Sequence, residues 1–296
     1  MSTRPSFRTI GIVGGGTMGQ GIAITCASAG LDVLLRDRSP ADAQRALAEI
    51  GEVLDADIAK WRRTESEKRA VLARVKAVEP MDALTAAELV IEAVPEDLEL
   101  KTAIFQELDR CCPPEDLLAT NTSALSVTEI AARTRRPDRV IGLHFLHPVP
   151  RVPLVEVVRG LATSDATFQA ALDFVRIIGK TGVEVFESPG YVTTRVILPF
   201  INEAMYVVME GVASAEAVDT SMKLGYGLPT GPLALADRMG LDEVMRWMQH
   251  LFVELGDVKY RPCPLLRKMI RAGHLGVKSG KGFFEYPEGG SEGGRT

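Results

Sequence analysis

Two side chains near the middle of the chain have the types and the spacing of a proton-transfer pair. Residues 142–158 read G-L-H-F-L-H-P-V-P-R-V-P-L-V-E-V-V and contain His144 and Glu156. Residues 152–158 alternate and are rich in β-branched side chains, which predicts a buried strand. A carboxylate inside a strand is costly unless it is paired, and an imidazole that it holds in one tautomer can serve as a general base. The alternative is a structural histidine on a proline-rich turn, with the glutamate at a strand edge.

The second histidine of this stretch, His147, raises the question of a metal site. A protein zinc site needs three or four ligands. Two histidines three residues apart on an extended segment point to opposite faces. We therefore predict no metal at His144 and His147.

A glycine-rich turn near the N-terminus predicts binding of a dinucleotide. Gly14, Gly16 and Gly19 fit G-x-G-x-x-G between an expected strand and an expected helix, with Thr17 and Met18 inside the motif. The glycines permit the tight turn, close approach of a pyrophosphate, and packing of helix on strand. The N-terminus of the helix then offers its N–H groups to the phosphates.

Asp37 follows the next expected strand and predicts which dinucleotide is bound. An acidic side chain there accepts the two hydroxyls of an adenosine ribose and repels a 2′-phosphate, so NAD is favoured over NADP. Arg36 and Arg38 flank this aspartate, and either could instead bind a phosphate.

Strand and helix patterns alternate from residue 9 to residue 186, which predicts a doubly wound parallel sheet. The expected strands are residues 9–13, 32–35, 75–78, 89–94, 117–120, 140–143, 152–158 and 183–186. Ligands of such sheets bind at the carboxyl ends of the strands, where Glu96, Lys101 and Ser123 follow. Glu96 also suits ordinary helix N-terminal chemistry. Ser126 is expected to cap the next helix with Glu129, which leaves Ser123 available to a ligand.

The rest of the chain predicts a second, all-α domain. We expect an NAD-binding domain at residues 1–187, a helical domain at 188–287 and a disordered tail at 288–296, because apolar positions recur at helical spacing after Ser188-Pro189-Gly190. Residues 40–74 predict two amphipathic helices interrupted at Lys60-Trp61-Arg62-Arg63. That cluster could hold a nucleotide-like anion or be a solvated helix end.

Composition narrows the class of protein. The 296 residues carry a net charge of −5 with a pI near 5.6, which argues against general binding of nucleic acid. No apolar run reaches the length of a membrane span, and the first eight residues lack a signal-peptide core. The four cysteines have no disulfide or zinc spacing, so we expect a cytoplasmic protein.

Further motifs complete the pattern: V-I-E-A-V-P-E from Val90, N-T-S-A-L from Asn121, P-L-V-E-V-V from Pro153, G-P-L-A-L-A-D from Gly231 and K-S-G-K-G-F-F from Lys278. In this order and over nearly the whole chain they resemble the 3-hydroxyacyl-CoA dehydrogenases, in particular the bacterial 3-hydroxybutyryl-CoA type. The resemblance implies an α/β Rossmann-type doubly wound sheet followed by an all-α C-terminal domain, as in 6-phosphogluconate dehydrogenase. It also implies a homodimer formed through that domain.

The resemblance further implies a role for each site residue. His144 takes the proton of the 3-hydroxyl of a (3S)-3-hydroxyacyl-CoA while hydride passes to NAD, and Glu156 orients the imidazole. Ser123 binds the substrate oxygen, and Lys60 falls where the CoA moiety is held. The implied cofactor contacts are Asp37, Glu96, Lys101, Ser123, His147 and Lys278, besides the glycine-rich turn.

Two positions depart from the family pattern. The family has H-F-F-N-P where this chain has H-F-L-H-P, so His147 replaces an asparagine near the nicotinamide. Thr194 stands where a catalytic-site asparagine is expected, and its hydroxyl lacks the reach and second donor of an amide. These departures leave two alternatives open: a dehydrogenase of a non-CoA hydroxy acid, such as carnitine or a sugar acid, and a non-catalytic NAD-binding protein.

Overall fold

The computed structural model describes residues 7–286, so the expected tail at 288–296 lies outside the described residues. The chain divides into two compact units, Met1–Ser188 and Pro189–Thr296. Each unit has its own hydrophobic core.

The first unit is built on one eight-stranded sheet with the strand order β3-β2-β1-β4-β5-β6-β7-β8. The strands are β1 Thr9–Val13, β2 Asp32–Arg36, β3 Val75–Val78, β4 Leu89–Glu92, β5 Leu117–Thr120, β6 Val140–Phe145, β7 Leu154–Arg159 and β8 Thr181–Phe186. The expected α/β Rossmann-type sheet is confirmed. The order reverses between β1 and β4, so the carboxyl ends of these two strands flank the crevice where ligands of doubly wound sheets bind.

One pairing differs from the expected parallel sheet. β6 pairs with β7 in antiparallel fashion, and β8 pairs with β7 in parallel. Only residues 146–153 join β6 to β7, which is too short for the crossover that parallel neighbours require. The antiparallel return brings β7 back from the same edge of the sheet at which β6 ends.

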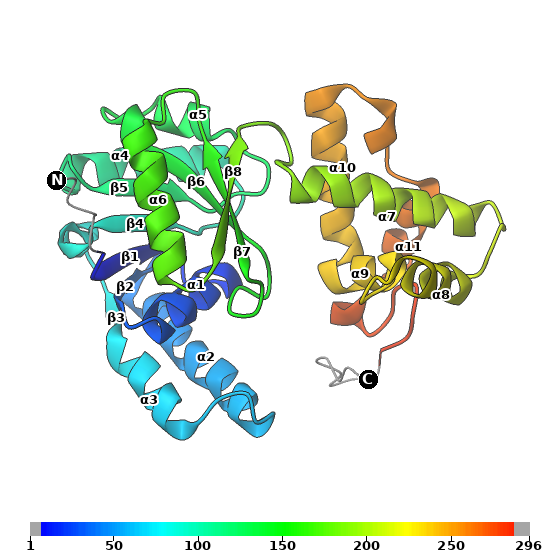
Figure 1. Cartoon of the computed structure of the whole chain (residues 1–296), viewed down its shortest axis with the longest axis horizontal. Helices are drawn as coiled ribbons and strands as arrows, with labels where there is room; N and C mark the ends of the chain where they lie inside the picture. The colour runs from blue at the N-terminus through cyan, green and yellow to red at the C-terminus, as the bar shows by residue number, and fades with distance from the viewer. Residues whose placement is uncertain (1–6, 287–296) are drawn as a thin grey trace. The chain divides into compact units, whose positions relative to one another are not determined.

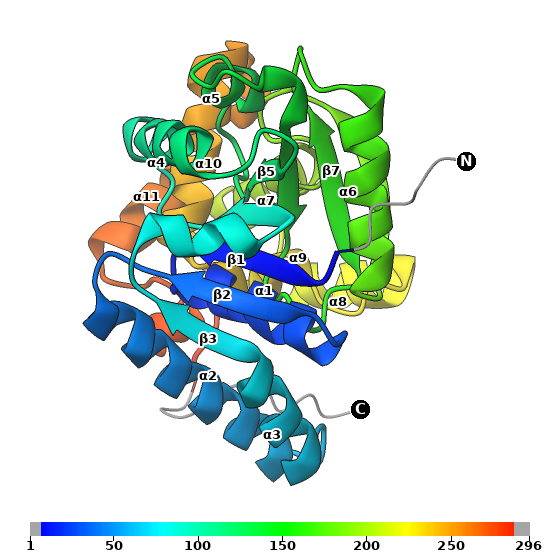
Figure 2. The same ribbon diagram turned by 90° about the vertical axis from the view of Figure 1, so that its left-hand side faces the viewer.

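Helices cover both faces of this sheet (Figures 1 and 2). Helices α1, α2 and α6 pack on one face, where Ile10, Ile22 and Phe174 are among the core residues, and α4 and α5 contact the other face. The helices of this unit are α1 Thr17–Ser28, α2 Pro40–Ala59, α3 Glu65–Arg74, α4 Leu98–Cys111, α5 Val127–Ala131 and α6 Asp165–Ile177, with 3-10 turns η1 Met81–Ala86 and η2 Pro137–Arg139.

Local sequence accounts for where these helices begin. Thr64 and Glu67 form a complete capping box at the start of α3, and Ser126 caps α5 by accepting from the N–H of Glu129, as expected. α2 ends at Ala59 and α3 begins at Glu65, so the expected break at residues 60–63 is confirmed.

The second unit is helical, as expected. Its elements are α7 Thr193–Met209, α8 Ala215–Tyr226, α9 Pro232–Met239, α10 Leu241–Leu255, η3 Val258–Tyr260, α11 Pro264–Arg271 and η4 Val277–Ser279. Buried Asp237 on α9 accepts hydrogen bonds from the N–H groups of Phe283 and Phe284 and from the Tyr286 hydroxyl. Burial raises the pKa of Asp237 despite these bonds. The carboxylate thereby ties the K-S-G-K-G-F-F segment to α9.

Across residues 7–286, no helix has both the length and the apolar character needed to cross a membrane.

Candidate active site

His144 and Glu156 form a buried pair across two neighbouring strands. His144 on β6 lies directly opposite Glu156 on β7, and Nδ1 of the imidazole is 2.6 Å from Oε2 of the carboxylate. Both side chains are almost fully buried, at 6% and 1% exposure. A carboxylate only accepts hydrogen bonds, so Nδ1 carries the proton and Nε2 is the basic nitrogen. The pair therefore has the arrangement of an oriented general base.

The glycine-rich turn joins β1 to α1 and has the geometry of a phosphate site. Gly14 has φ +106°, and a Cβ added to it would lie 2.7 Å from the carbonyl oxygen of Ala93. A Cβ on Gly19 would lie 1.8 Å from the carbonyl oxygen of Gly14, so helix and strand pack too closely for any side chain there. Gly16 and Thr17 are exposed, and no side chain caps α1. The open N-terminus of α1 thus fits the pyrophosphate of a dinucleotide.

Two polar side chains hold this turn from either side. Asp37, just after β2, accepts from the N–H of Gly15 through Oδ2, at 2.9 Å. Gln20 on α1 donates from Nε2 to the carbonyl oxygen of Gly15, at 2.8 Å, and also to Glu49 on α2. The predicted ribose-binding aspartate therefore lies beside the turn. The role of Gln20 was not predicted, although its place directly after the glycine motif was a usable signal.

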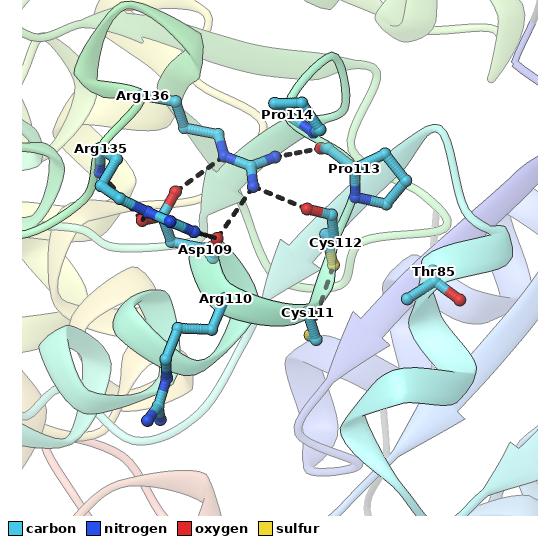
Figure 3. A pocket seen from close by; sticks show the side chains of 9 residues that line it. All are labelled: Thr85, Asp109, Arg110, Cys111, Cys112, Pro113, Pro114, Arg135 and Arg136. Carbon is cyan, nitrogen blue, oxygen red and sulfur yellow. Dashed lines mark hydrogen bonds and ion pairs between the residues drawn. The ribbon is translucent and has the colours of Figure 1, made fainter.

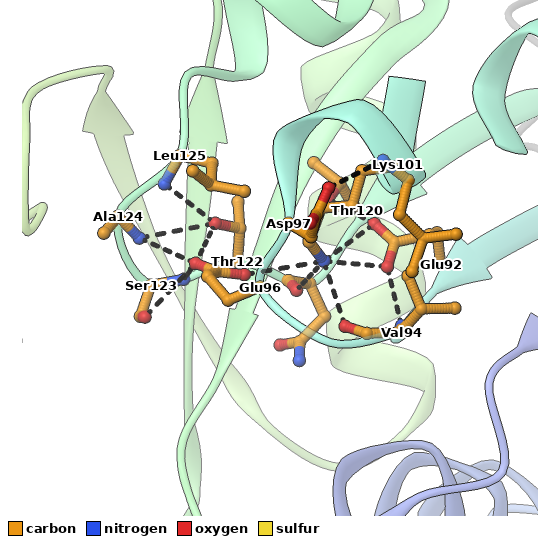
Figure 4. A network of polar contacts seen from close by, with 12 residues as sticks. Glu92, Val94, Glu96, Asp97, Lys101, Thr120, Thr122, Ser123, Ala124 and Leu125 are labelled. Carbon is orange, nitrogen blue, oxygen red and sulfur yellow. Dashed lines mark hydrogen bonds and ion pairs between the residues drawn. The ribbon is translucent and has the colours of Figure 1, made fainter. Parts of the chain in front are cut away.

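A fully buried ion pair links the ends of β4 and β5 (Figure 4). Nζ of Lys101 on α4 lies 2.7 and 3.0 Å from the carboxylate oxygens of Glu92, and it also donates to the carbonyl oxygen of Asn121. Thr120 donates its hydroxyl hydrogen to the same carboxylate. Burial raises the pKa of Glu92 against the opposing effect of Lys101. Glu92 was not singled out from the sequence, because this residue lies within an otherwise apolar run.

Lys101 has no exposed surface, so its ammonium group serves this internal network. Its predicted contact with the cofactor stays a prediction. The network also fixes the strand that carries His144, because Oδ1 of Asn121 accepts from the N–H of Phe145, which follows His144.

Glu96 organises the loop that carries Ser123 (Figure 4). Its Oε1 accepts from the N–H groups of Ser123 and Ala124, at 2.9 and 3.2 Å, and from the Thr122 hydroxyl. Its other oxygen is 3.5 Å from Nζ of Lys101. The structure thus brings Glu96 and Ser123 together at the carboxyl edge of the sheet.

The remaining predicted residues lie in three places. Lys60 is exposed in the turn between α2 and α3, and His147 is exposed in the loop after β6. Thr194, in the first turn of α7, and Lys278, in η4, belong to the helical unit. Lys278 pairs with Asp242 there, with Nζ 2.6 Å from the carboxylate, and Thr194 is buried.

A surface pocket of about 580 Å³ lies at the opposite edge of the sheet, beside the segments that precede β5 and β6 (Figure 3). In its lining, Arg135 and Arg136 both bind Asp109. Arg136 donates to Oδ1 of Asp109 and to the carbonyl oxygen of Cys112. Burial raises the pKa of Asp109, but hydrogen bonds from Arg135 and Arg136 outweigh it and hold the pKa below the ordinary value. Burial raises the pKa of the Cys112 thiol to about 12, so this thiol is a poor nucleophile. We therefore interpret this pocket as a structural feature and not as an active site.

Comparison with known proteins gives concordant results for both units. The model of the 3-hydroxyacyl-CoA dehydrogenase NAD-binding domain matches residues 9–188, and that of the C-terminal domain of the same family matches residues 190–286. A probable 3-hydroxybutyryl-CoA dehydrogenase of Bacillus subtilis is 50% identical over 95% of this chain and 98% of its own length. The 3-hydroxybutyryl-CoA dehydrogenase of Bradyrhizobium diazoefficiens is 46% identical over 95% and 96%. The crystal structure of (S)-3-hydroxybutyryl-CoA dehydrogenase from Ralstonia eutropha superposes with a TM-score of 0.89 at 47% identity, over 95% of this chain and 99% of that one.

Proposed function

Because the chain belongs to the 3-hydroxyacyl-CoA dehydrogenase family as an NAD-dependent enzyme, we propose that it interconverts (3S)-3-hydroxybutyryl-CoA and acetoacetyl-CoA. The names of its relatives support the short-chain substrate. The observation that carries the chemistry is the buried His144–Glu156 pair at the carboxyl edge of the sheet.

In the proposed mechanism His144 is the general base. Its Nε2 takes the proton of the 3-hydroxyl as carbon 3 is oxidised, and returns it in the reverse direction. Glu156 keeps the proton of neutral imidazole on Nδ1 and offsets the charge of the imidazolium that forms. Since both groups are buried, the carboxylate of Glu156 stabilises the imidazolium of His144 more strongly than it would in water.

NAD, when bound, accepts the hydride from carbon 3. The exposed start of α1 at Gly16 and Thr17 would hold its pyrophosphate, with Gly14, Met18 and Gly19 shaping the turn. Asp37 would accept the hydroxyls of the adenosine ribose. We assign Glu96, Lys101, His147 and Lys278 to the binding of the nicotinamide half of NAD. Lys101 would act there indirectly, through its ion pairs with Glu92 and Glu96.

Ser123 and Thr194 complete the proposed substrate site. The backbone N–H of Ser123 is bound to Glu96, which fixes the residue at the edge of the sheet. Its hydroxyl would then donate a hydrogen bond to the substrate oxygen. Thr194 would supply one hydrogen-bond donor where the family pattern has the amide of an asparagine. We expect this replacement to tune the rate or the choice of substrate and not to abolish turnover.

Lys60 and its neighbours are proposed to bind the CoA moiety. Trp61 beside it is almost fully exposed, at 96%, and has φ +57°, which is rare for a bulky side chain. A basic group beside an exposed ring suits a phosphorylated adenine. We expect Lys60→Ala to raise the KM for acetoacetyl-CoA about two- to fivefold at low salt, as for one exposed ion pair. The KM for NADH should not change, and an equal rise in both would contradict the assignment.

The decisive assay of the proposed function is oxidation of NADH by the purified protein with acetoacetyl-CoA. We expect turnover with the CoA ester and little with free acetoacetate or with NADPH. A preference for NADPH would mean that Arg36 or Arg38 overrides Asp37. Turnover with free hydroxy or oxo acids would favour the non-CoA alternative. Binding of NADH without any turnover would favour a non-catalytic protein, and His147 and Thr194 would be the first residues to change to asparagine.

We also propose that the protein is a cytoplasmic homodimer formed through its helical unit. Large apolar side chains are exposed on that unit, among them Val212, Leu224 and Tyr226, each more than 70% exposed. Exposed apolar side chains of this size are removed from water when two copies associate, which favours association. A monomer in sedimentation at micromolar concentration would overturn the proposal.

A further inference from the structure

The loop of residues 146–153 is held by a buried lysine that the proposed mechanism does not use. Nζ of Lys180 donates to the carbonyl oxygens of Val149 and Val152, at 2.6 Å each. Lys180 is only 8% exposed, and burial lowers its pKa. Within residues 7–286 no carboxylate forms an ion pair with it, so its partners are these carbonyl groups. Burying a cation without a counter-ion costs free energy, so the presence of a lysine at this position needs a physical explanation.

The backbone delivers Lys180 to this place. α6 ends in a Schellman motif, in which Gly179 has φ +73°, its N–H binds the carbonyl of Arg176, and the N–H of Lys180 binds the carbonyl of Val175. The next residue, Thr181, donates its N–H to the carbonyl of Pro153 at 2.7 Å as β8 begins. The end of α6 is therefore attached to the loop by three hydrogen bonds.

The loop is anchored on its other sides as well. Val149 is buried against α1, where a Cβ added to Gly21 would lie 2.9 Å from the Cβ of Val149. Arg151 pairs with Asp57 on α2, with 3.2 Å between nitrogen and oxygen. The loop starts one residue after Phe145 and ends at β7, so it links the strands of His144 and Glu156.

We propose that Lys180 is a positioning residue for the dehydrogenase reaction. By binding the carbonyls of Val149 and Val152 it fixes the loop 146–153, and with it the position of His147 at the carboxyl edge where hydride is transferred. Lys180 itself touches neither substrate nor cofactor. This inference rests on the proposed function. Substitution of Lys180 should therefore change the rate of the reaction more than the binding of NADH.

Lys180→Met tests the proposal by leaving two buried carbonyl oxygens without their donor. We expect kcat with acetoacetyl-CoA to fall about 10- to 100-fold, as when catalytic groups are displaced by about an ångström. The KM for NADH should change less than threefold, because most of that affinity comes from the adenosine and pyrophosphate contacts. Val175→Ala is the matched control. It weakens the core of α6 but keeps the Lys180 side chain, so its kcat should stay within twofold of the parent.

Two further measurements separate positioning from loss of stability. In the protein without ligands, amide hydrogen exchange at Arg151 and Val152, whose N–H groups bind the carbonyl of Pro148, should accelerate at least tenfold in Lys180→Met but not in Val175→Ala. If Lys180 acts through His147, the rate losses of Lys180→Met and His147→Ala should combine to less than their product.

Each outcome has a defined meaning. Unchanged kcat in Lys180→Met, unchanged loop exchange, or an equal loss of kcat in Val175→Ala overturns the inference. Fully multiplicative effects with His147→Ala would overturn the action through His147. A parent protein without turnover of acetoacetyl-CoA would instead refute the proposed function, and the exchange measurement would still decide whether Lys180 fixes the loop.

Discussion

Replacing His144 with glutamine should leave the fold and the affinity for NADH intact while lowering kcat by about 10²- to 10⁴-fold, the usual contribution of a general base. Glutamine can still donate a hydrogen bond to Glu156, so the contact between β6 and β7 survives. It has no basic nitrogen, so it cannot take the proton of the 3-hydroxyl. Steady-state kinetics and titration of NADH fluorescence measure the two quantities separately.

A second His→Gln substitution serves as the control for His144→Gln. His250 lies on α10 and has no role in the proposed mechanism, so His250→Gln should keep kcat within twofold. Near-normal turnover in His144→Gln would refute the assigned mechanism. Loss of NADH binding together with turnover would instead show that the substitution damaged the fold, and melting curves would reveal it.

The sequence predicted the elements that carry the site because each has its own local signal. A short apolar run and the glycine spacing located β1 and the phosphate turn, alternation located β7, and Ser126 located the start of α5. Parallel strands share one carboxyl edge, so Asp37, Ser123 and His144 could be placed there before any coordinates were known. The family resemblance then supplied a role for each.

Other features depend on distances that the sequence does not encode directly. Glu92 hides in the apolar run of β4, and its partner Lys101 comes from the next helix, so nothing local pairs them. Lys180 forms no motif with Val149 and Val152, which lie about thirty residues earlier. The antiparallel turn after β6 did have a signal, since eight residues cannot hold a crossover. The partners of Glu92 and Lys180 could thus be recognised only from the structure.

The second large effect is expected at Gly19, where alanine should abolish measurable binding of NADH and destabilise the first unit by about 3 kcal/mol, the upper range for overpacking. The new Cβ would lie 1.8 Å from the carbonyl oxygen of Gly14. That carbonyl cannot easily move, because the N–H of Gly14 binds the carbonyl of Arg36 and the backbone of Ala93 lies so close that a Cβ added to Gly14 would be 2.7 Å from its carbonyl oxygen. α1 must then shift away from β1, and the N–H groups at its N-terminus no longer point at the phosphates of NADH. Calorimetric titration and urea unfolding measure both effects.

Two other glycines show whether the effect at Gly19 is local. Gly51 lies inside α2 with no atom within 4 Å of an added Cβ, so Gly51→Ala should stabilise the fold by up to about 1 kcal/mol and leave NADH binding unchanged. Gly16 also has open space and φ −73°, so Gly16→Ala should cost the fold about 1 kcal/mol or less. Its methyl group would nevertheless meet the pyrophosphate and weaken NADH binding. Normal binding in both Gly16→Ala and Gly19→Ala would mean that the turn between β1 and α1 is not the phosphate site.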